Sequence, residues 1–317
     1  MISPFSPSRR RFMQVLSQLV AAISLGEAAP ATAAGGESPG KDQPRIGLAL
    51  GGGGAKGLAH ILMLEVFDEL GIRPAKIVGS SIGSIIGAMY ASGLSAKEIR
   101  AIVDRLTLNH LESLSPRELL SGDALRWIEF IDPAVGRGGL IDGEAFIEFL
   151  NETIKRTRFE ELAIPLGVVT AEFWTRRQVV FEKGALLPAI QASMAVPGVF
   201  TAVEIEDRYY VDGGMVNPVP YDLLVNDCDI SVAINVIGDA DKPPSTQPSY
   251  FEQIFGSIHI MQQAILNEKR QRIPPSIYIA PDLKGFRIVD FFRAKEIFAQ
   301  AEPAKAQLKR ELERVLA

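Results

Sequence analysis

The chain has 317 residues, 47% of them hydrophobic and 22% charged, which is enough for one large α/β domain with a sizeable core or for two small domains. Its formal net charge is −5 and it carries no basic block, so a nucleic-acid partner is not expected. Cys228 is the single cysteine, which excludes an internal disulfide and a cysteine-based metal cage, and the three histidines lack zinc-type spacing. We therefore expect neither a metal nor a cofactor.

The first residues have the order of a cleavable export signal. Arg9 and Arg10 form a twin-arginine pair, the apolar run 15–25 follows, and small residues close the segment. This order predicts a twin-arginine-type signal peptide over residues 1–34 and export to the periplasm. The alternative is an uncleaved basic tail, which would leave the protein in the cytoplasm or associated with a membrane. Residues 35–44, rich in glycine, serine, proline and charge, are expected to form a flexible leader.

After the leader, strand-like and helix-like segments alternate. This order predicts a single α/β domain over residues 45–317, with a mostly parallel sheet flanked by helices. Most of the expected strands are continuous apolar runs, as in strands covered on both faces. They are Ile46–Leu50, Lys76–Gly79, Leu166–Ala171, Gln178–Phe181, Tyr209–Asp212, Ile230–Val236 and Ile277–Ala280. Helices are expected over 58–70 and 82–91 and in the amphipathic C-terminal stretch.

One long segment, residues 106–139, is crowded with leucines and aromatic residues. It is either an apolar wall or lid beside a lipid-accepting cleft, or an ordinary packed pair of helices. Apolar residues at helical spacing usually belong to a core, which favours the second interpretation.

A glycine-rich turn, G-G-G-G-A-K-G over residues 51–57, follows the first expected strand. Backbone N–H groups at Gly52, Gly53 and Gly54 are not crowded by side chains, which is what an oxyanion hole requires. With Gly57 the spacing also matches a dinucleotide-binding fingerprint, but the next strand does not end in the acidic residue that this fingerprint needs. A phosphate-binding loop would need a serine or threonine after the lysine, where this chain has glycine. Both nucleotide-binding interpretations therefore fail.

A second turn, G-S-S-I-G from Gly79 to Gly83, follows the second expected strand and opens a helix. Glycines on both sides of a serine between strand and helix are typical of a nucleophile elbow, in which the turn must be tight. Ser81 would stand at its tip, near a helix N-terminus that favours developing negative charge. Ser80 and Ser84 flank the tip and are the alternatives. The G-x-S-x-G string alone is a weak signal, and its placement strengthens it.

An elbow serine needs a base, for which Asp212 is the best candidate. A short expected strand ends at this aspartate, and Gly213 and Gly214 then turn the chain. A carboxylate at the carboxyl edge of a sheet is well placed, because the sites of α/β proteins gather there. The alternative is an aspartate that only caps a turn.

The histidines are weaker candidates for the base. His60 lies in an apolar stretch behind the glycine turn, which favours a core or supporting residue, and His110 and His259 follow no expected strand end. A carboxylate base predicts that activity rises with pH through a pKa near or somewhat above ~4, whereas a histidine base predicts ~6.5.

With these motifs in this order, the chain resembles the patatin-like phospholipase family. The resemblance spans roughly residues 46–220 and rests on the glycine loop, the elbow, the Asp-Gly-Gly turn and the block A-S-M-A-V-P-G-V-F over residues 192–200. Thr201 departs from the family, where proline is frequent after this block; the difference affects loop rigidity and not the chemistry.

The resemblance implies a three-layer α/β/α fold with a mostly parallel central sheet. It also implies a serine–aspartate dyad, here Ser81 and Asp212, that acts without histidine. Family members cleave acyl esters of phospholipids, lysophospholipids or neutral lipids, so the expected partners are such a lipid and, transiently, a membrane surface. A catalytically idle lipid-binding or scaffold protein is the alternative.

Overall fold

The computed structural model describes residues 44–113, 144–238, 247–248 and 250–317. The expected signal peptide, nearly all of the expected leader and residues 114–139 of the leucine-rich segment lie outside these residues. Within the described part of the chain, no helix combines the length and the apolar character that a membrane-spanning segment needs.

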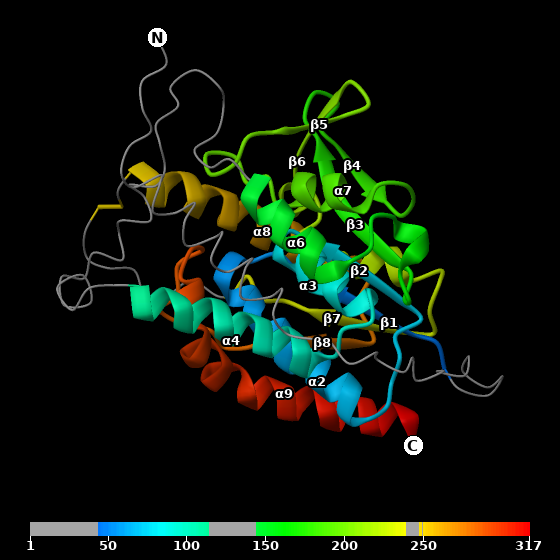
Figure 1. The fold of residues 1–317 in the computed structure, drawn as a ribbon. Helices are drawn as coiled ribbons and strands as arrows, with labels where there is room; N and C mark the ends of the chain where they lie inside the picture. The colour runs from blue at the N-terminus through cyan, green and yellow to red at the C-terminus, as the bar shows by residue number, and fades with distance from the viewer. Residues whose placement is uncertain (1–43, 114–143, 239–246, 249) are drawn as a thin grey trace, which may run out of the picture.

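The described residues form an eight-stranded mixed sheet in the order β5-β6-β3-β2-β1-β7-β8, with β4 paired to β3 (Figure 1). The strands are β1 Ile46–Leu50, β2 Lys76–Ser80, β3 Leu166–Glu172, β4 Arg177–Phe181, β5 Val203–Ile205, β6 Arg208–Asp212, β7 Ile230–Ile234 and β8 Ile277–Ile279. Strands β3, β2, β1, β7 and β8 are parallel, and β4, β5 and β6 join them in antiparallel pairs. The expected mostly parallel α/β sheet is confirmed, with an antiparallel part at one end.

Helices cover both faces of this sheet. The α-helices are α2 His60–Glu69, α3 Ile82–Ala91, α4 Ala96–Ser113, α6 Glu144–Ile154, α7 Leu186–Ser193, α8 Tyr250–Arg272 and α9 Ala294–Leu316. Short 3-10 helices are η1 Gly54–Ala59, η3 Phe159–Glu161, η4 Gly213–Met215, η5 Tyr221–Leu224 and η6 Phe291–Arg293. Figure 1 shows α4, α2 and α9 side by side along one face, where α2 contacts both of its neighbours.

The alternation of side chains along β1 explains the two layers. All five residues of β1 are buried. Ile46, Leu48 and Leu50 belong to the larger core, which α2, α3 and α9 cover, whereas Ala49 belongs to a smaller core on the other face. Successive side chains of a strand point to opposite faces, so a strand buried on both faces must be apolar throughout. This burial fixes the carboxyl ends of β1 and β2, where the glycine-rich turns begin.

Candidate active site

Ser81 is at the tip of the sharp turn between β2 and α3. Its φ of +53° and ψ of −126° are costly for a non-glycine residue, and such strain is typical of functional positions. Ser81 is 9% exposed, whereas Ser80 and Ser84 are fully buried. The hydroxyl of Ser80 donates to the carbonyl of Asn217 at 2.6 Å, and that of Ser84 donates to the carbonyl of Ser81 at 2.7 Å. Of the three serines, only Ser81 therefore reaches the surface.

The motif glycines are required because neighbouring groups approach their backbone closely. A Cβ atom on any of them would lie less than 3.0 Å from another atom, a distance that real Cβ atoms essentially never show. They are Gly57, Gly79, Gly83, Gly213 and Gly214. At Gly83 the obstacle is the backbone of Leu50, so α3 begins in direct contact with the end of β1.

Ser81 and Asp212 are brought together by a strand that they share. β3 pairs with β2 through Val169, opposite Ser80, and with β6 through Thr170, opposite Asp212. β4 pairs with the opposite edge of β3. β2 and β6 therefore pair with the same edge of β3, and the pairing with β6 begins where the pairing with β2 ends. Asp212 therefore lies beside the elbow, where its carboxylate is hydrogen-bonded to the Ser81 side chain.

Burial sets the proton affinity of Asp212. The residue is 4% exposed, and this loss of solvent raises the pKa of its carboxyl to about 6. Hydrogen bonds from the Ser81 side chain and from the Gly214 N–H, at 2.7 Å, lower the pKa only part of the way back. This pKa of about 6 lies above the expected range, which was near or somewhat above ~4. At neutral pH the group is mostly ionised, yet more basic than an exposed carboxylate.

His60 supports the glycine turn from behind. It is fully buried, and its Nε2 atom lies 2.8 Å from the carbonyl oxygen of Gly51. Burial lowers the pKa of His60 to about 4, although the bond to Gly51 opposes this shift. The ring is thus neutral above this range, and Nε2 carries the hydrogen that it donates. Its Nδ1 atom has no hydrogen-bond partner among the described residues. In this site the aspartate has the higher pKa and the histidine the lower one.

In the glycine turn, which we call the glycine loop, the backbone N–H groups differ in whether they are free to bind a ligand. The N–H of Gly52 donates to the carbonyl of Pro218 at 2.9 Å, so it cannot bind an oxyanion as expected. The N–H groups of Gly53 and Gly54 have no partner among the described residues. A Cβ atom at Gly52 would lie 3.4 Å from the Cβ of Ser81, an ordinary van der Waals distance, so Gly52 lies against the elbow but has room for a small side chain.

A third donor was missed by the sequence analysis. Ile82 is the first residue of α3, and its N–H has no partner among the described residues, as expected at a helix N-terminus. In nucleophile elbows the residue after the serine supplies one oxyanion donor. That position alone was the signal that could have identified Ile82.

Ser193, at the end of α7, holds the elbow backbone in place. Its hydroxyl accepts the N–H of Ser81 at 2.9 Å and donates to the carbonyl of Val169 at 2.6 Å. The side chain is fully buried, so it joins the strained turn to β3 without contact with solvent. The sequence placed Ser193 in a family-like block but gave no sign of this role.

The turn before α9 packs against the glycine loop. The carbonyl oxygen of Ile288 accepts the N–H of Ala55 at 2.9 Å. Gly54 has φ +57°, and a Cβ atom there would lie 2.9 Å from the Cα of Ile288. Only glycine therefore fits between the loop and this turn, which we call the C-terminal brace and define as residues 284–293.

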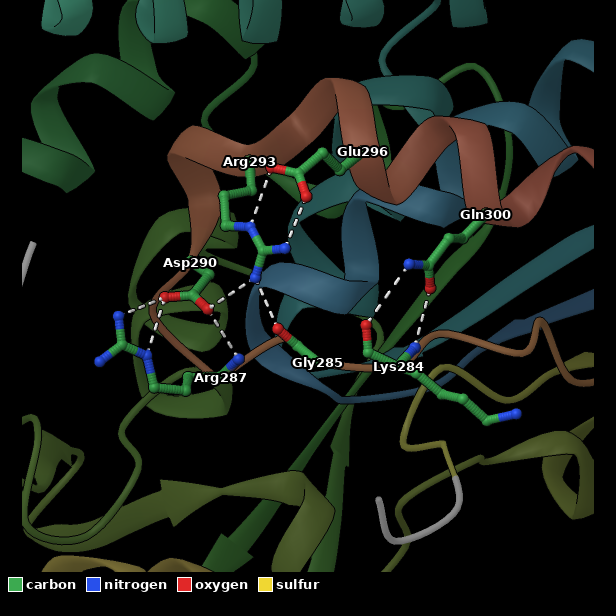
Figure 2. A network of polar contacts seen from close by, with 7 residues as sticks. All are labelled: Lys284, Gly285, Arg287, Asp290, Arg293, Glu296 and Gln300. Atoms are coloured by element: carbon green, nitrogen blue, oxygen red, sulfur yellow. Dashed lines mark hydrogen bonds and ion pairs between the residues drawn. The ribbon is translucent and has the colours of Figure 1, made fainter. Parts of the chain in front are cut away.

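A buried carboxylate organises the C-terminal brace (Figure 2). Asp290 is 2% exposed and accepts hydrogen bonds from the backbone N–H of Arg287, at 2.9 Å, and from its guanidinium. Arg293 approaches the same carboxylate and also forms an ion pair of 2.6 Å with Glu296 of α9. Figure 2 shows a second tie, in which Gln300 of α9 accepts the N–H of Lys284. These contacts fix the turn that presents Ile288.

A buried ion pair between Lys269 and Asp222 stabilises a second segment that supports the site. Lys269 of α8 is 6% exposed and lies 2.7 Å from Asp222. Burial lowers the pKa of this lysine, while Asp222 opposes the shift. Its ammonium also donates to oxygen atoms of the segment 217–219. That segment accepts the hydroxyl of Ser80 and the N–H of Gly52, so it joins the elbow to the glycine loop.

His259 of α8 lies 3.2 Å from the carbonyl of Gly238, and the side chain of His110 is outside the described residues. Within the described ranges, no group of three or more histidine, cysteine, aspartate or glutamate side chains is placed to hold a metal ion.

A strained serine, a buried carboxylate and N–H groups without a partner among the described residues therefore come together at this edge of the sheet. A family model described as patatin-like phospholipase matches residues 48–225, more than half of the chain. The chain therefore belongs to the patatin-like phospholipase family.

The relatives include uncharacterized NTE family proteins. One from Mycobacterium tuberculosis (strain ATCC 25618 / H37Rv) is 30% identical over 205 residues, which cover 64% of this chain and 52% of that protein. Lysophospholipase NTE1 of Saccharomyces cerevisiae is 24% identical over 276 residues, which cover 80% of this chain and 16% of that protein. The chain thus spans about half the length of this mycobacterial relative and a smaller part of the yeast one.

Two solved structures are also similar. VipD from Legionella pneumophila matches with a TM-score of 0.42 and 16% identity, covering 83% of this chain and 66% of that one. ExoU from Pseudomonas aeruginosa, in complex with SpcU, matches with a TM-score of 0.46 and 16% identity, covering 86% and 53%.

Proposed function

We propose that the protein is a serine hydrolase that cleaves fatty-acyl esters of phospholipids or related lipids, with Ser81 as nucleophile and Asp212 as base. The hydrogen bond between these two side chains, beside N–H groups of Gly53 and Gly54 that have no partner in the described part of the chain, is the observation that carries the proposal. Membership of the patatin-like phospholipase family supports a lipid substrate, as does the name lysophospholipase of the yeast relative.

In the first half of the reaction, Ser81 Oγ attacks the ester carbonyl while its proton passes to the Asp212 carboxylate. The carbonyl oxygen becomes an oxyanion and is bound by the N–H groups of Gly53, Gly54 and Ile82. Losing one such donor in a hydrolase costs on the order of 100-fold or more in rate. The intermediate collapses, the bond to the alcohol breaks, and Asp212 returns the proton to the leaving oxygen.

In the second half, water attacks the acyl-serine while Asp212 accepts one of its protons. Collapse of the second intermediate releases the fatty acid, and the proton returns to Ser81. One carboxylate thus serves as base and acid in both halves. Its pKa of about 6 suits this work, because proton transfer is most effective when the pKa lies near the working pH.

The alternative is a catalytically idle lipid-binding or scaffold protein. The intact pairing of Ser81 with Asp212 disfavours it, because a buried carboxylate with a raised pKa is a burden on stability that a scaffold does not need. An esterase assay on the purified protein separates the two.

The test of the proposal is covalent labelling combined with turnover. A fluorophosphonate probe should label Ser81 alone, and Ser81→Ala should abolish both labelling and hydrolysis of a p-nitrophenyl acyl ester. Ser84→Ala is the matched control, because that hydroxyl is buried and donates to a carbonyl. Labelling at Ser80 or Ser84 would contradict the assignment of the nucleophile.

We also propose that the protein is exported by the twin-arginine route, a proposal supported by the order of residues 1–34. The mature chain should begin near Ala34 or Gly35, and Arg9→Lys with Arg10→Lys should abolish export. Mature-length periplasmic protein from that double variant would contradict this route.

A further inference from the structure

The turn between β3 and β4 exposes two large aromatic side chains. Phe173 is 48% exposed and Trp174 is 72% exposed, and their rings pack edge to face with centroids 5.0 Å apart. Arg176 and Arg177 follow, both exposed and without an ion pair among the described residues. Aromatic side chains beside unpaired cations are typical of segments at the interface between lipid and water.

This turn is rigid rather than loosely extended. The carboxylate of Glu172, which is almost fully buried, accepts the N–H of Trp174 at 3.2 Å and the N–H of Thr175 at 2.7 Å. It also accepts the Thr175 hydroxyl, and the carbonyl of Glu172 accepts the N–H of Arg176 at 2.9 Å. The aromatic side chains are therefore held in an exposed position by the backbone, so that little ordering is needed when they bind.

The turn lies at the same edge of the sheet as the candidate active site. β3 is parallel to β2, and Val169 pairs with Ser80, next to the nucleophile. Glu172 lies three residues further along β3, which at the rise of a strand is about 10 Å beyond the elbow. Figure 1 shows the end of β3, with β4, β5 and β6, rising away from the layer of α2, α4 and α9. A surface that binds this turn would face the active-site edge.

We propose that residues 173–177, the aromatic turn, dock the protein on the surface of an anionic phospholipid bilayer. The inference rests on the proposed function, because it supplies the route by which a lipid reaches Ser81. The two rings enter the interfacial layer, and Arg176 and Arg177 bind phosphate groups. Docking at this edge places the elbow on the order of 15 Å from the lipids, on the same side of the sheet, so an acyl ester has a short path to it.

Because its surroundings add no positive charge, the aromatic turn depends on Arg176 and Arg177 for its preference for anionic lipid. The adjacent β5–β6 turn carries Glu206 and Asp207 as well as Arg208, so it adds no positive charge of its own. The whole chain is also acidic, with a net charge of −5. The preference for anionic lipid should therefore disappear when the arginine pair is neutralised. Each basic residue near such a surface strengthens binding by about fivefold.

The experiment measures vesicle binding without turnover, in full-length Ser81→Ala protein. The Ser81→Ala protein should co-sediment with vesicles that contain phosphatidylglycerol and bind phosphatidylcholine vesicles much more weakly. Phe173→Ser with Trp174→Ser should reduce binding to both kinds of vesicle about tenfold or more. Arg176→Gln with Arg177→Gln should remove the preference for phosphatidylglycerol. In a Trp127→Phe background, the emission of Trp174 should shift to the blue on binding.

Matched controls come from the opposite edge of the sheet. Val225 is 50% exposed and lies shortly before Asp229, whose N–H donates to the carbonyl of Arg45, the residue before β1. Val225→Ser should leave binding unchanged. Lys155 and Arg156 are two consecutive exposed cations that follow α6. Lys155→Gln with Arg156→Gln should also leave vesicle binding unchanged.

Two results would overturn the docking proposal: binding that survives loss of the aromatic pair, or equal binding to neutral and anionic vesicles. Measuring hydrolysis as well as binding distinguishes failure of the docking proposal from failure of the proposed function. With Ser81 intact, the aromatic and arginine variants should hydrolyse a soluble p-nitrophenyl ester at the wild-type rate and vesicle phospholipid more slowly. If the protein showed no esterase activity, the proposed function would be contradicted, but the docking proposal would not.

Discussion

The two sides of the glycine loop are built by different parts of the chain. On the side that faces Ser81, the polar groups come from residues 46–220, which carry the motifs and largely coincide with the family match. On the other side, the carbonyls of Ile234 and Ile288, from the C-terminal third, accept N–H groups from the two ends of the loop. The motifs therefore supply the groups that we propose to react, and a region without recognisable motifs holds the shape of the loop.

The largest effect should come from Gly54→Ala, where the two parts meet. Gly54 has φ +57° and leaves no room for a Cβ atom beside Ile288, so the loop must move and two oxyanion donors move with it. We expect kcat/KM for a p-nitrophenyl ester to fall by about 100-fold or more. Gly71→Ala is the matched control, because Gly71 has φ +66° and open space around it. That variant should lose about 1–2 kcal/mol of stability and keep its kcat/KM. Equal losses of activity in the two variants would contradict the role of the C-terminal brace.

An intermediate effect is expected for Ser193→Ala, on the side of Ser81. The substitution leaves the buried N–H of Ser81 and the carbonyl of Val169 without this partner, which costs about 1–3 kcal/mol. Because the strained elbow then relaxes, we expect kcat to fall about tenfold and KM to change little. Ser92→Ala tests the alternative of a general loss of stability, since that hydroxyl donates to a carbonyl at the far end of α3. If both variants lost stability but neither lost kcat, Ser193 would be only structural.

The smallest effect is expected for Asp290→Asn, on the C-terminal side. The amide weakens the ion pairs with Arg287 and Arg293, and the turn that presents Ile288 becomes less fixed. We expect kcat to fall about threefold to fivefold with KM unchanged, since the loss is in loop geometry and not in substrate contacts. Glu296→Gln breaks another pair of the same Arg293 and should leave kcat unchanged. An effect on KM alone would mean that the C-terminal brace contacts substrate instead of the loop.

Much of the fold could be predicted from the sequence. The strands of the parallel part are continuous apolar runs, and the helix over 82–91 ends where expected. β5 was missed because it has three residues and is only partly buried. The elbow and the Asp-Gly-Gly turn could be found because tight turns demand glycine at fixed positions. Their closeness in space depends on the pairing of β3 with both β2 and β6, which no local pattern encodes.

The supporting residues and the pKa values could not be predicted in the same way. Ser193, Asp290 and Lys269 act through contacts far apart in sequence, and nothing in their local sequence distinguishes them. Burial, which the sequence does not specify at single residues, raises the pKa of Asp212 and lowers that of His60. The expected contrast, a low pKa for a carboxylate base and a higher one for histidine, is therefore inverted.

The pH dependence of kcat/KM, measured in the wild type, His60→Gln and Asp212→Asn, tests the central claim most directly. Asp212 must be ionised to accept the serine proton, so wild-type activity should rise with pH through a pKa near 6. Glutamine can still donate to the Gly51 carbonyl, so His60→Gln should keep that pKa even if its rate falls uniformly. Asp212→Asn should lose nearly all activity. Near-normal turnover in Asp212→Asn, or a pKa near 6 that disappears in His60→Gln, would contradict the serine–aspartate mechanism.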